Sequence, residues 1–179
     1  YTTRTRFAQL VRQEIKHVKS GRKGRIILKL NNLVDAAMIE LLYGASQAGV
    51  KIDLIVRGIC SLKAGIEGLS ENIRARSIIG RDLEHGRVLY FANDGDPLYF
   101  LSSADWMGRN LDRRVEVSVP IYDRQLQAQV GAMLDLQLKD NVRARKLDNQ
   151  LQNKFVKRRS KSIQLDCQQA LYEFYVNDT

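Results

Sequence analysis

The chain has 179 residues, enough to bury a sizeable core in one domain, or in one domain with an appendage. Its 29 Lys and Arg residues outnumber 20 Asp and Glu, and the net charge of +9 favours a polyanionic partner: nucleic acid, an anionic membrane surface or inorganic polyphosphate. No apolar run approaches the roughly 20 residues of a membrane-spanning helix, so the sequence predicts none.

The chain contains two cysteines, Cys60 and Cys167, whose spacing matches neither a metal site nor a disulfide framework. We therefore expect thiols in a reducing compartment and a cytoplasmic location, with a peripheral position at the inner membrane as the alternative. No stretch has the character of a signal peptide. The sequence starts at Tyr1 without a Met, and we expect it to be a piece of a longer protein.

The first half of the chain shows alternating helix and strand patterns. Apolar residues at helical spacing predict helices over 4–19 and 34–48. Apolar runs predict strands at 26–30, 51–56 and 73–79. A strand, a helix and a strand joined by short connections predict a right-handed parallel crossover, and hence an α/β fold.

A lysine inside the first predicted strand is a candidate site residue. Lys29 interrupts the apolar run, and Asn31 follows where the strand ends. A Lys in a buried strand directs its ammonium group at an anion or at a carboxylate. The alternative is an edge strand on which Lys29 is solvated.

An arginine follows the predicted strand at 51–56. Arg57 stands at the carboxyl end of this strand, where the ligands of such sheets bind. Its planar guanidinium can pair two phosphate oxygens at once, and Gly58 lets the backbone approach a ligand closely. The alternative is an ion pair between Arg57 and Glu71 or Glu84.

Residues 84–116 organise the chain. Two apolar runs separated by an Asn-Asp-Gly turn predict a β-hairpin. His85 and Arg87 leave one end of this hairpin, and Ser103 and Asp105 leave the end of the partner strand. Antiparallel pairing would bring the four side chains together, and an imidazole, a guanidinium, a hydroxyl and a carboxylate around one space suit a phosphate.

The last third of the chain has weaker patterns. A strand is predicted at 117–120 and an amphipathic helix at 123–138. The polar stretch 141–153 fits either a helix or a loop, and the basic run 155–161 is either solvated or follows a polyanion. Apolar spacing predicts a final helix over 163–175.

The segment around His85 resembles the second half-site of the phospholipase D superfamily. There a His-x-Lys strand is followed, one hairpin later, by a Ser-x-Asn segment and a Glu; here Arg87 replaces the Lys and Asp105 replaces the Asn. The C-terminal part of bacterial polyphosphate kinases is a closer resemblance and covers most of residues 20–122. The segments that carry it are RIILKLNNLVD at 25–35, ASQAGVKIDLIVRGIC at 45–60, GLSENIR at 68–74, LEH at 83–85 and the run 102–120.

This resemblance implies an α/β fold in which a phospholipase-D-like mixed sheet is flanked by helices. Residues 1–140 would form this domain, and residues 141–179 a helical extension packed on it. The implied reaction is reversible transfer of the terminal phosphate of ATP to inorganic polyphosphate, through a phosphohistidine in a preceding domain. The implied partners are ATP or ADP, polyphosphate, upstream domains of the same polypeptide and further copies in a homo-oligomer, with no specific nucleic acid. Mg²⁺ would be held by ligands outside this chain.

The resemblance also implies roles for single residues. Arg57 would bind the nucleotide, and His85 would be the second histidine, which assists transfer as an acid–base or charge-stabilising group. Phosphoryl transfer requires mainly positioning and positive charge around the phosphate oxygens. The candidate site consists of side chains able to bind or orient a phosphate: Lys29, Asn31, Arg57, His85 and Arg87, supported by Ser103 and Asp105.

Two other functions stay open from the residues. A phospholipase-D-type phosphodiesterase or nuclease would pair two copies of the half-site across a dimer, and Arg87 and Asp105 argue against it. A non-catalytic module that binds a polyanion or nucleic acid requires only the basic charge.

Overall fold

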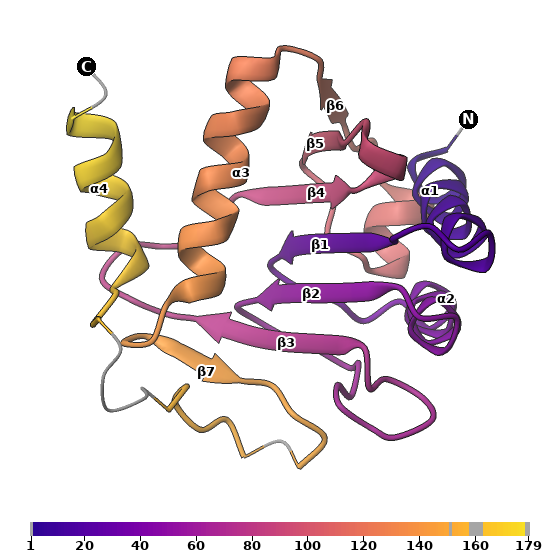
Figure 1. The fold of residues 1–179 in the computed structure, drawn as a ribbon, viewed down its shortest axis with the longest axis horizontal. Helices are drawn as coiled ribbons and strands as arrows, with labels where there is room; N and C mark the ends of the chain where they lie inside the picture. The colour runs from indigo at the N-terminus through magenta and orange to yellow at the C-terminus, as the bar shows by residue number, and fades with distance from the viewer. Residues whose placement is uncertain (1, 151, 158–162, 178–179) are drawn as a thin grey trace.

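The computed structural model describes residues 2–150, 152–157 and 163–177. Its centre is a seven-stranded mixed sheet in the order β6-β5-β4-β1-β2-β3-β7 (Figure 1). Three parallel strands form the middle of the sheet: β1 (Arg25–Leu30), β2 (Lys51–Val56) and β3 (Ile73–Ile78). The other strands run antiparallel to their neighbours: β4 (Arg87–Phe91), β5 (Leu98–Ser102), β6 (Ser118–Ile121) and β7 (Ala144–Lys146).

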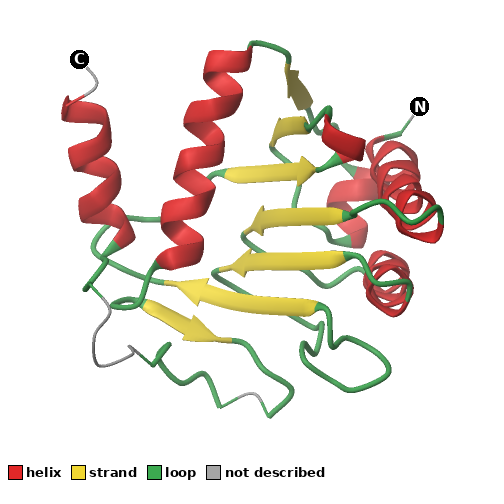
Figure 2. Ribbon diagram, viewed as in Figure 1, coloured by secondary structure: helices red, strands yellow, loops and turns green. Residues whose placement is uncertain are grey.

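Helices cover both faces of this sheet (Figure 2). One side carries α1 (Thr3–Lys19) and α2 (Ala36–Gln47), and the other carries α3 (Arg124–Lys139) and α4 (Cys167–Asn177). Two short helical turns lie in the connections: η1 (Asn93–Gly95) and η2 (Arg109–Arg113). None of the helices in the described part of the chain combines the length and apolar character of a membrane span.

The inner strands are apolar on both faces because helices bury both. Ile26 and Leu28 of β1 pack in the cluster that contains α1 and α2 residues, whereas Ile27 packs in the cluster that contains Leu134 of α3 and Cys167 of α4. Successive side chains of a strand point to opposite faces, so β1 contributes to both layers. The near-continuous apolar runs of the sequence follow from this double burial.

Aspartates start two of the helices. The Asp35 carboxylate accepts a hydrogen bond from the Met38 N–H at 3.1 Å, and Asp123 accepts one from the Leu126 N–H at 3.0 Å. An N-cap carboxylate satisfies N–H groups that have no partner within the helix. Both helices therefore begin within two residues of the predicted positions.

The predicted mixed sheet flanked by helices is confirmed, but the chain after residue 140 differs from the expectation. We expected helix or loop over 141–153; instead Ala144–Lys146 pairs antiparallel with β3 and extends the sheet by one edge strand. A strand of three residues is too short for an apolar alternation, and so the sequence did not indicate it. Residues 158–161 of the basic run lie outside the described residues, whereas the final helix is present as α4.

Candidate functional site

Four segments meet at one end of the sheet, beyond the carboxyl ends of β1 and β2, which the arrowheads of these strands mark in Figure 1. Because β4 runs antiparallel to β1, and β5 to β4, the start of β4 and the end of β5 lie at this same end. Asn31 follows β1, Arg57 follows β2, His85 precedes β4 and Asp105 follows β5. Four strands of the sheet therefore fix the backbone next to each candidate side chain.

His85 lies between two guanidinium groups. Its Nδ1 is 3.1 Å from Nη2 of Arg57, and its Nε2 is 3.5 Å from Nη1 of Arg87. A neutral imidazole has one acceptor nitrogen and guanidinium groups only donate, so only one of these contacts is a hydrogen bond in either tautomer. The other guanidinium has donors to spare for an anion.

The side chain of Asn31 orients Arg57. Arg57 Nε donates to Asn31 Oδ1, and Asn31 Nδ2 donates to the backbone oxygen of His85 at 3.4 Å. Among the described residues no carboxylate forms an ion pair with Arg57, so the considered pairing with Glu71 or Glu84 is absent. The charge of this half-buried arginine is therefore available to an anionic ligand.

Asp105 is a carboxylate with only 4% of its surface exposed. Its Oδ1 accepts hydrogen bonds from the Asn31 N–H at 2.8 Å and from Arg87 Nε at 3.0 Å, and its Oδ2 accepts one from Asn32 Nδ2 at 2.9 Å. Burial alone would raise the pKa of Asp105, but the hydrogen bonds from Arg87, Asn32 and Asn31 together outweigh it and lower the pKa. Arg87 and Asp105, the two residues that differ from the phospholipase D pattern, thus form an ion pair with each other.

Ser103 contacts other groups than we expected. Its hydroxyl donates to the carboxylate of Glu116 and accepts a hydrogen bond from the Val117 N–H at 3.0 Å. The bond from Ser103, together with one from Asn110, holds the pKa of Glu116 below its usual value. In the described part of the chain these contacts tie the β5–β6 connection together and do not reach His85.

Lys29 is paired with a carboxylate that lines the pocket beside Arg57. It shares a strand face with Ile27, the face covered by α3, and its ammonium nitrogen lies 2.9 Å from Oε2 of Glu84. Of the partners considered for Lys29, which were an anion, a carboxylate or solvent, the structure shows a carboxylate. Arg57 and Arg87 contact His85 directly, whereas Lys29 lies behind Glu84; phosphate binding by Lys29 stays a prediction.

Glu84 connects the segment before the histidine to both helices of that face. Its carboxylate accepts hydrogen bonds from Gln137 of α3 at 2.8 Å and from Gln168 of α4 at 2.9 Å. Gln168 also donates to the backbone oxygen of Asp82 at 2.8 Å and accepts from the Asp82 N–H at 3.1 Å. One side chain of α4 thus holds residues 82–84. Neither Glu84 nor Gln168 stands out in the sequence as a site residue.

Gln168→Ala should loosen this segment without unfolding the chain. Each lost hydrogen bond is worth about 1 kcal/mol, so hydrogen exchange at the Asp82 amide should quicken by about fivefold or more. The control is Gln169→Ala, because the amide of Gln169 donates to Glu173 within α4. Equal exchange in the two variants would show that Gln168 does not hold the segment.

A pocket of about 260 Å³ opens beside Arg57 and is lined on its other side by residues 78–84. It offers room for a ligand next to the guanidinium. In the described ranges, no group of three or more His, Cys, Asp or Glu side chains is placed to hold a metal ion.

Comparison with known proteins identifies related sequences. The family model described as polyphosphate kinase C-terminal domain 2 matches residues 1–168. A polyphosphate kinase of Vibrio cholerae is 48% identical over 175 residues, which are 98% of this chain and 25% of that protein. The Escherichia coli polyphosphate kinase is 45% identical over 166 residues, 93% of this chain and 24% of that protein. The chain spans about a quarter of the length of these curated relatives.

Solved structures agree with the sequence matches. The crystal structure of a polyphosphate kinase from Porphyromonas gingivalis matches with a TM-score of 0.96 and 40% identity, over 99% of this chain and 27% of that one. NucT from Helicobacter pylori matches with a TM-score of 0.54 over 78% of this chain and 93% of its own, and at 12% identity it shows the fold alone. Nuc from Salmonella typhimurium, a phospholipase D family member, matches with a TM-score of 0.53 and 12% identity over 75% of this chain and 88% of its own. The expected phospholipase-D-like fold is thereby confirmed, and the chain belongs to the polyphosphate kinase C-terminal domain 2 family.

Proposed function

We propose that this chain supplies one half of the site at which a polyphosphate kinase reversibly transfers the terminal phosphate of ATP to inorganic polyphosphate. The observation that carries the proposal is the imidazole of His85 between the guanidinium groups of Arg57 and Arg87. A phosphoryl group in transfer spreads negative charge over its three outer oxygens, and catalysis depends on fixed positive charge around them. The names of the relatives supply polyphosphate, and the family resemblance implies ATP as the phosphate donor.

In this proposal each side chain has a separate task. Arg57 binds phosphate oxygens through its Nη atoms, because Asn31 already engages its Nε. Arg87 is held by Asp105, so it offers its charge from a fixed position. His85 acts on the leaving oxygen as an acid–base or charge-stabilising group; the phosphohistidine itself lies in a preceding domain, as the family resemblance implies.

The expected partners go beyond what the comparisons establish. The proposal includes contact with upstream domains of the same polypeptide, assembly into a homo-oligomer, and Mg²⁺ carried by ATP and held by ligands outside this chain. The cytoplasmic location stays a prediction. A phosphodiesterase is not proposed, because the likeness to NucT at 12% identity concerns the fold alone.

Arg57→Ala should weaken ATP use, in an enzyme that carries this chain, by about 1.5–3 kcal/mol, the range for a hydrogen bond to a charged group. Arg57→Lys should recover only part of this loss, because an ammonium group cannot pair two phosphate oxygens in one plane. Steady-state kinetics with ATP as the varied substrate measures both. Wild-type kinetics in Arg57→Ala would remove the residue from the site.

The 179-residue chain on its own should bind polyphosphate but should neither label itself nor extend the polymer. It has one histidine half-site, and the proposal places the phosphate-accepting histidine elsewhere. The test is incubation with radiolabelled ATP and magnesium, followed by a search for acid-labile label on the protein. Label that disappears in His85→Ala would make His85 the nucleophile and would contradict the proposed division of tasks.

A further inference from the structure

Positive charge collects at the β7 edge of the sheet, two strands beyond β2, the strand that Arg57 follows. Residues 139–157 contain six Lys and Arg against two Asp and no Glu, so this stretch carries about four of the nine net positive charges. Part of the stretch forms β7, and residues 154–156 run beside it, with hydrogen bonds of 2.8 Å at Lys146 N–H and Val156 N–H. The edge strand thus presents its cations on an ordered backbone.

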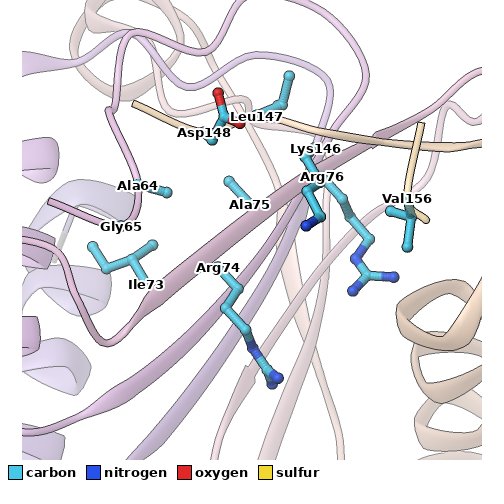
Figure 3. Close-up of a pocket in the computed structure, with 10 residues that line it drawn as sticks. All are labelled: Ala64, Gly65, Ile73, Arg74, Ala75, Arg76, Lys146, Leu147, Asp148 and Val156. Carbon is cyan, nitrogen blue, oxygen red and sulfur yellow. The ribbon is translucent and has the colours of Figure 1, made fainter. Parts of the chain in front are cut away.

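Two basic side chains on neighbouring strands face each other directly at this edge. Arg76 of β3 is the cross-strand partner of Lys146 of β7, and directly opposed residues of antiparallel strands share one face. Like charges in this position are destabilising. Arg74, two residues before Arg76, lies on the same face, and the guanidinium groups of both arginines project to the same side of β3 (Figure 3).

The neighbouring carboxylates are engaged elsewhere. Asp53 accepts from Arg74 Nε at 2.9 Å, and Asp140 accepts hydrogen bonds from four backbone N–H groups between Val142 and Cys167. Arg76, which is half-buried, donates to the backbone oxygen of Gln137 at 3.5 Å. In the described part of the chain, neither Arg76 nor Lys146 has a carboxylate within ion-pair distance.

A pocket of about 250 Å³ lies against these residues. Arg74, Arg76 and Lys146 line it together with small and aliphatic side chains, and none of the lining residues is aromatic. Asp148 is the one acid among the lining residues, and Figure 3 shows it at the opposite end of the pocket from the two guanidinium groups. An anion that enters would meet Arg76 and Lys146 without a carboxylate paired to either, whereas Arg74 is already paired with Asp53.

We infer that Arg76 and Lys146 form an anion-binding site that holds a second stretch of linear polyphosphate, beyond the stretch bound at His85. The identity of the polymer rests on the proposed function. A phosphate chain between the two opposed cations would remove their repulsion, and the exposed Lys154 and Lys157 continue the positive charge past the pocket. No aromatic side chain lines the pocket, and the guanidinium of Arg145, 3.9 Å from the ring centroid of the exposed Phe155 beside it, covers one face of that ring. Bases therefore have no free aromatic platform in the pocket, which favours polyphosphate over nucleic acid.

A second binding site at the β7 edge would keep the polyphosphate chain near His85. Once one stretch of a long chain is bound at the β7 edge, the binding of another stretch at His85 becomes intramolecular, and its effective concentration rises. Short polyphosphates that cannot reach both sites would gain nothing from it. The site therefore predicts a preference for long chains.

The test is binding of long-chain polyphosphate to the 179-residue chain carrying Arg76→Gln and Lys146→Gln together. Affinity should fall about tenfold, and the slope of log K against log salt should lessen by about 1.4, as for two released contacts on a single-stranded polyanion. Arg12→Gln with Lys16→Gln is the matched control. It removes an exposed pair of like charges one helical turn apart on α1, across the sheet. The control should lower the affinity less than threefold, as expected of non-specific charge alone.

Equal losses in the two double variants would show that only net charge matters and would overturn the inference. Equal loss of affinity for a single-stranded oligonucleotide would also overturn it, in favour of a general polyanion surface. The melting temperature of ligand-free Lys146→Gln should not fall, since the substitution removes a repulsion. A marked fall in the melting temperature would show that Arg76 and Lys146 stabilise the fold and would contradict the binding role. If the wild-type chain binds no polyphosphate at all, both the inference and the proposed function fail. If the wild-type chain binds polyphosphate but the two double variants lose affinity equally, only the inference fails.

Discussion

His85→Ala, in a polyphosphate kinase that carries this chain as its C-terminal domain, should lower turnover by about 10²–10⁴-fold, the range for a positioned acid or base. Folding should change little, because His85 is exposed and the ring contacts that the structure shows are with Arg57 and Arg87. Turnover per folded enzyme and the melting temperature together measure the two effects. Normal turnover in the folded variant would contradict the proposed role, and so would a failure to fold.

The other histidine of the chain provides the control. His17 is 7% exposed and lies on α1, where its Nδ1 is 3.9 Å from a carboxylate oxygen of Glu14. His17→Ala should therefore lower the melting temperature while turnover per folded molecule stays close to wild type. Opposite behaviour of the two variants would separate catalysis from folding.

The parts of the fold that were predicted correctly are those determined by residues close together in the sequence. The Asn-Asp-Gly turn predicted the hairpin, and in the structure Asn93, Asp94 and Gly95 all have positive φ angles, which these residue types adopt most readily. The hairpin then brought His85 and Arg87 close to Asp105, as its antiparallel pairing required. Local sequence therefore sufficed for the core of the candidate site.

The unpredicted parts depend on contacts between distant residues. Gln168 and Glu84 are 84 positions apart, and nothing in either segment indicates that α4 would pack over the loop before His85. The direction of Lys29 depended on which face of β1 meets α3, and an apolar run buried on both sides does not reveal that. The role of Asn32, whose side chain donates to Asp105, was missed because its neighbour Asn31 matched the family pattern better.

The Arg87–Asp105 pair leads to the largest expected effect on stability. Asp105→Ala should lower the free energy of unfolding by about 3–5 kcal/mol, because it leaves the Arg87 charge and the Asn31 N–H without their partner. Asp96→Ala is the control, since it breaks an Asp–Arg pair with Arg124 that is exposed on both sides, with a cost of about 0–1 kcal/mol. Denaturant unfolding measures both variants, and similar losses would show that the buried pair contributes no more than a surface pair.

The pH dependence of stability gives a second measure of the same pair. The folded protein lowers the pKa of Asp105, so the unfolded chain binds this proton more readily than the folded chain does. The contribution of Asp105 is therefore complete above the unfolded value of about 3.9 and is lost as pH falls through the lower folded value. Wild type should lose stability towards acid more steeply than Asp105→Ala, and the difference between them should shrink below pH ~4. A difference that stays constant from neutral to acid pH would show that Asp105 acts through its packing and not through its charge.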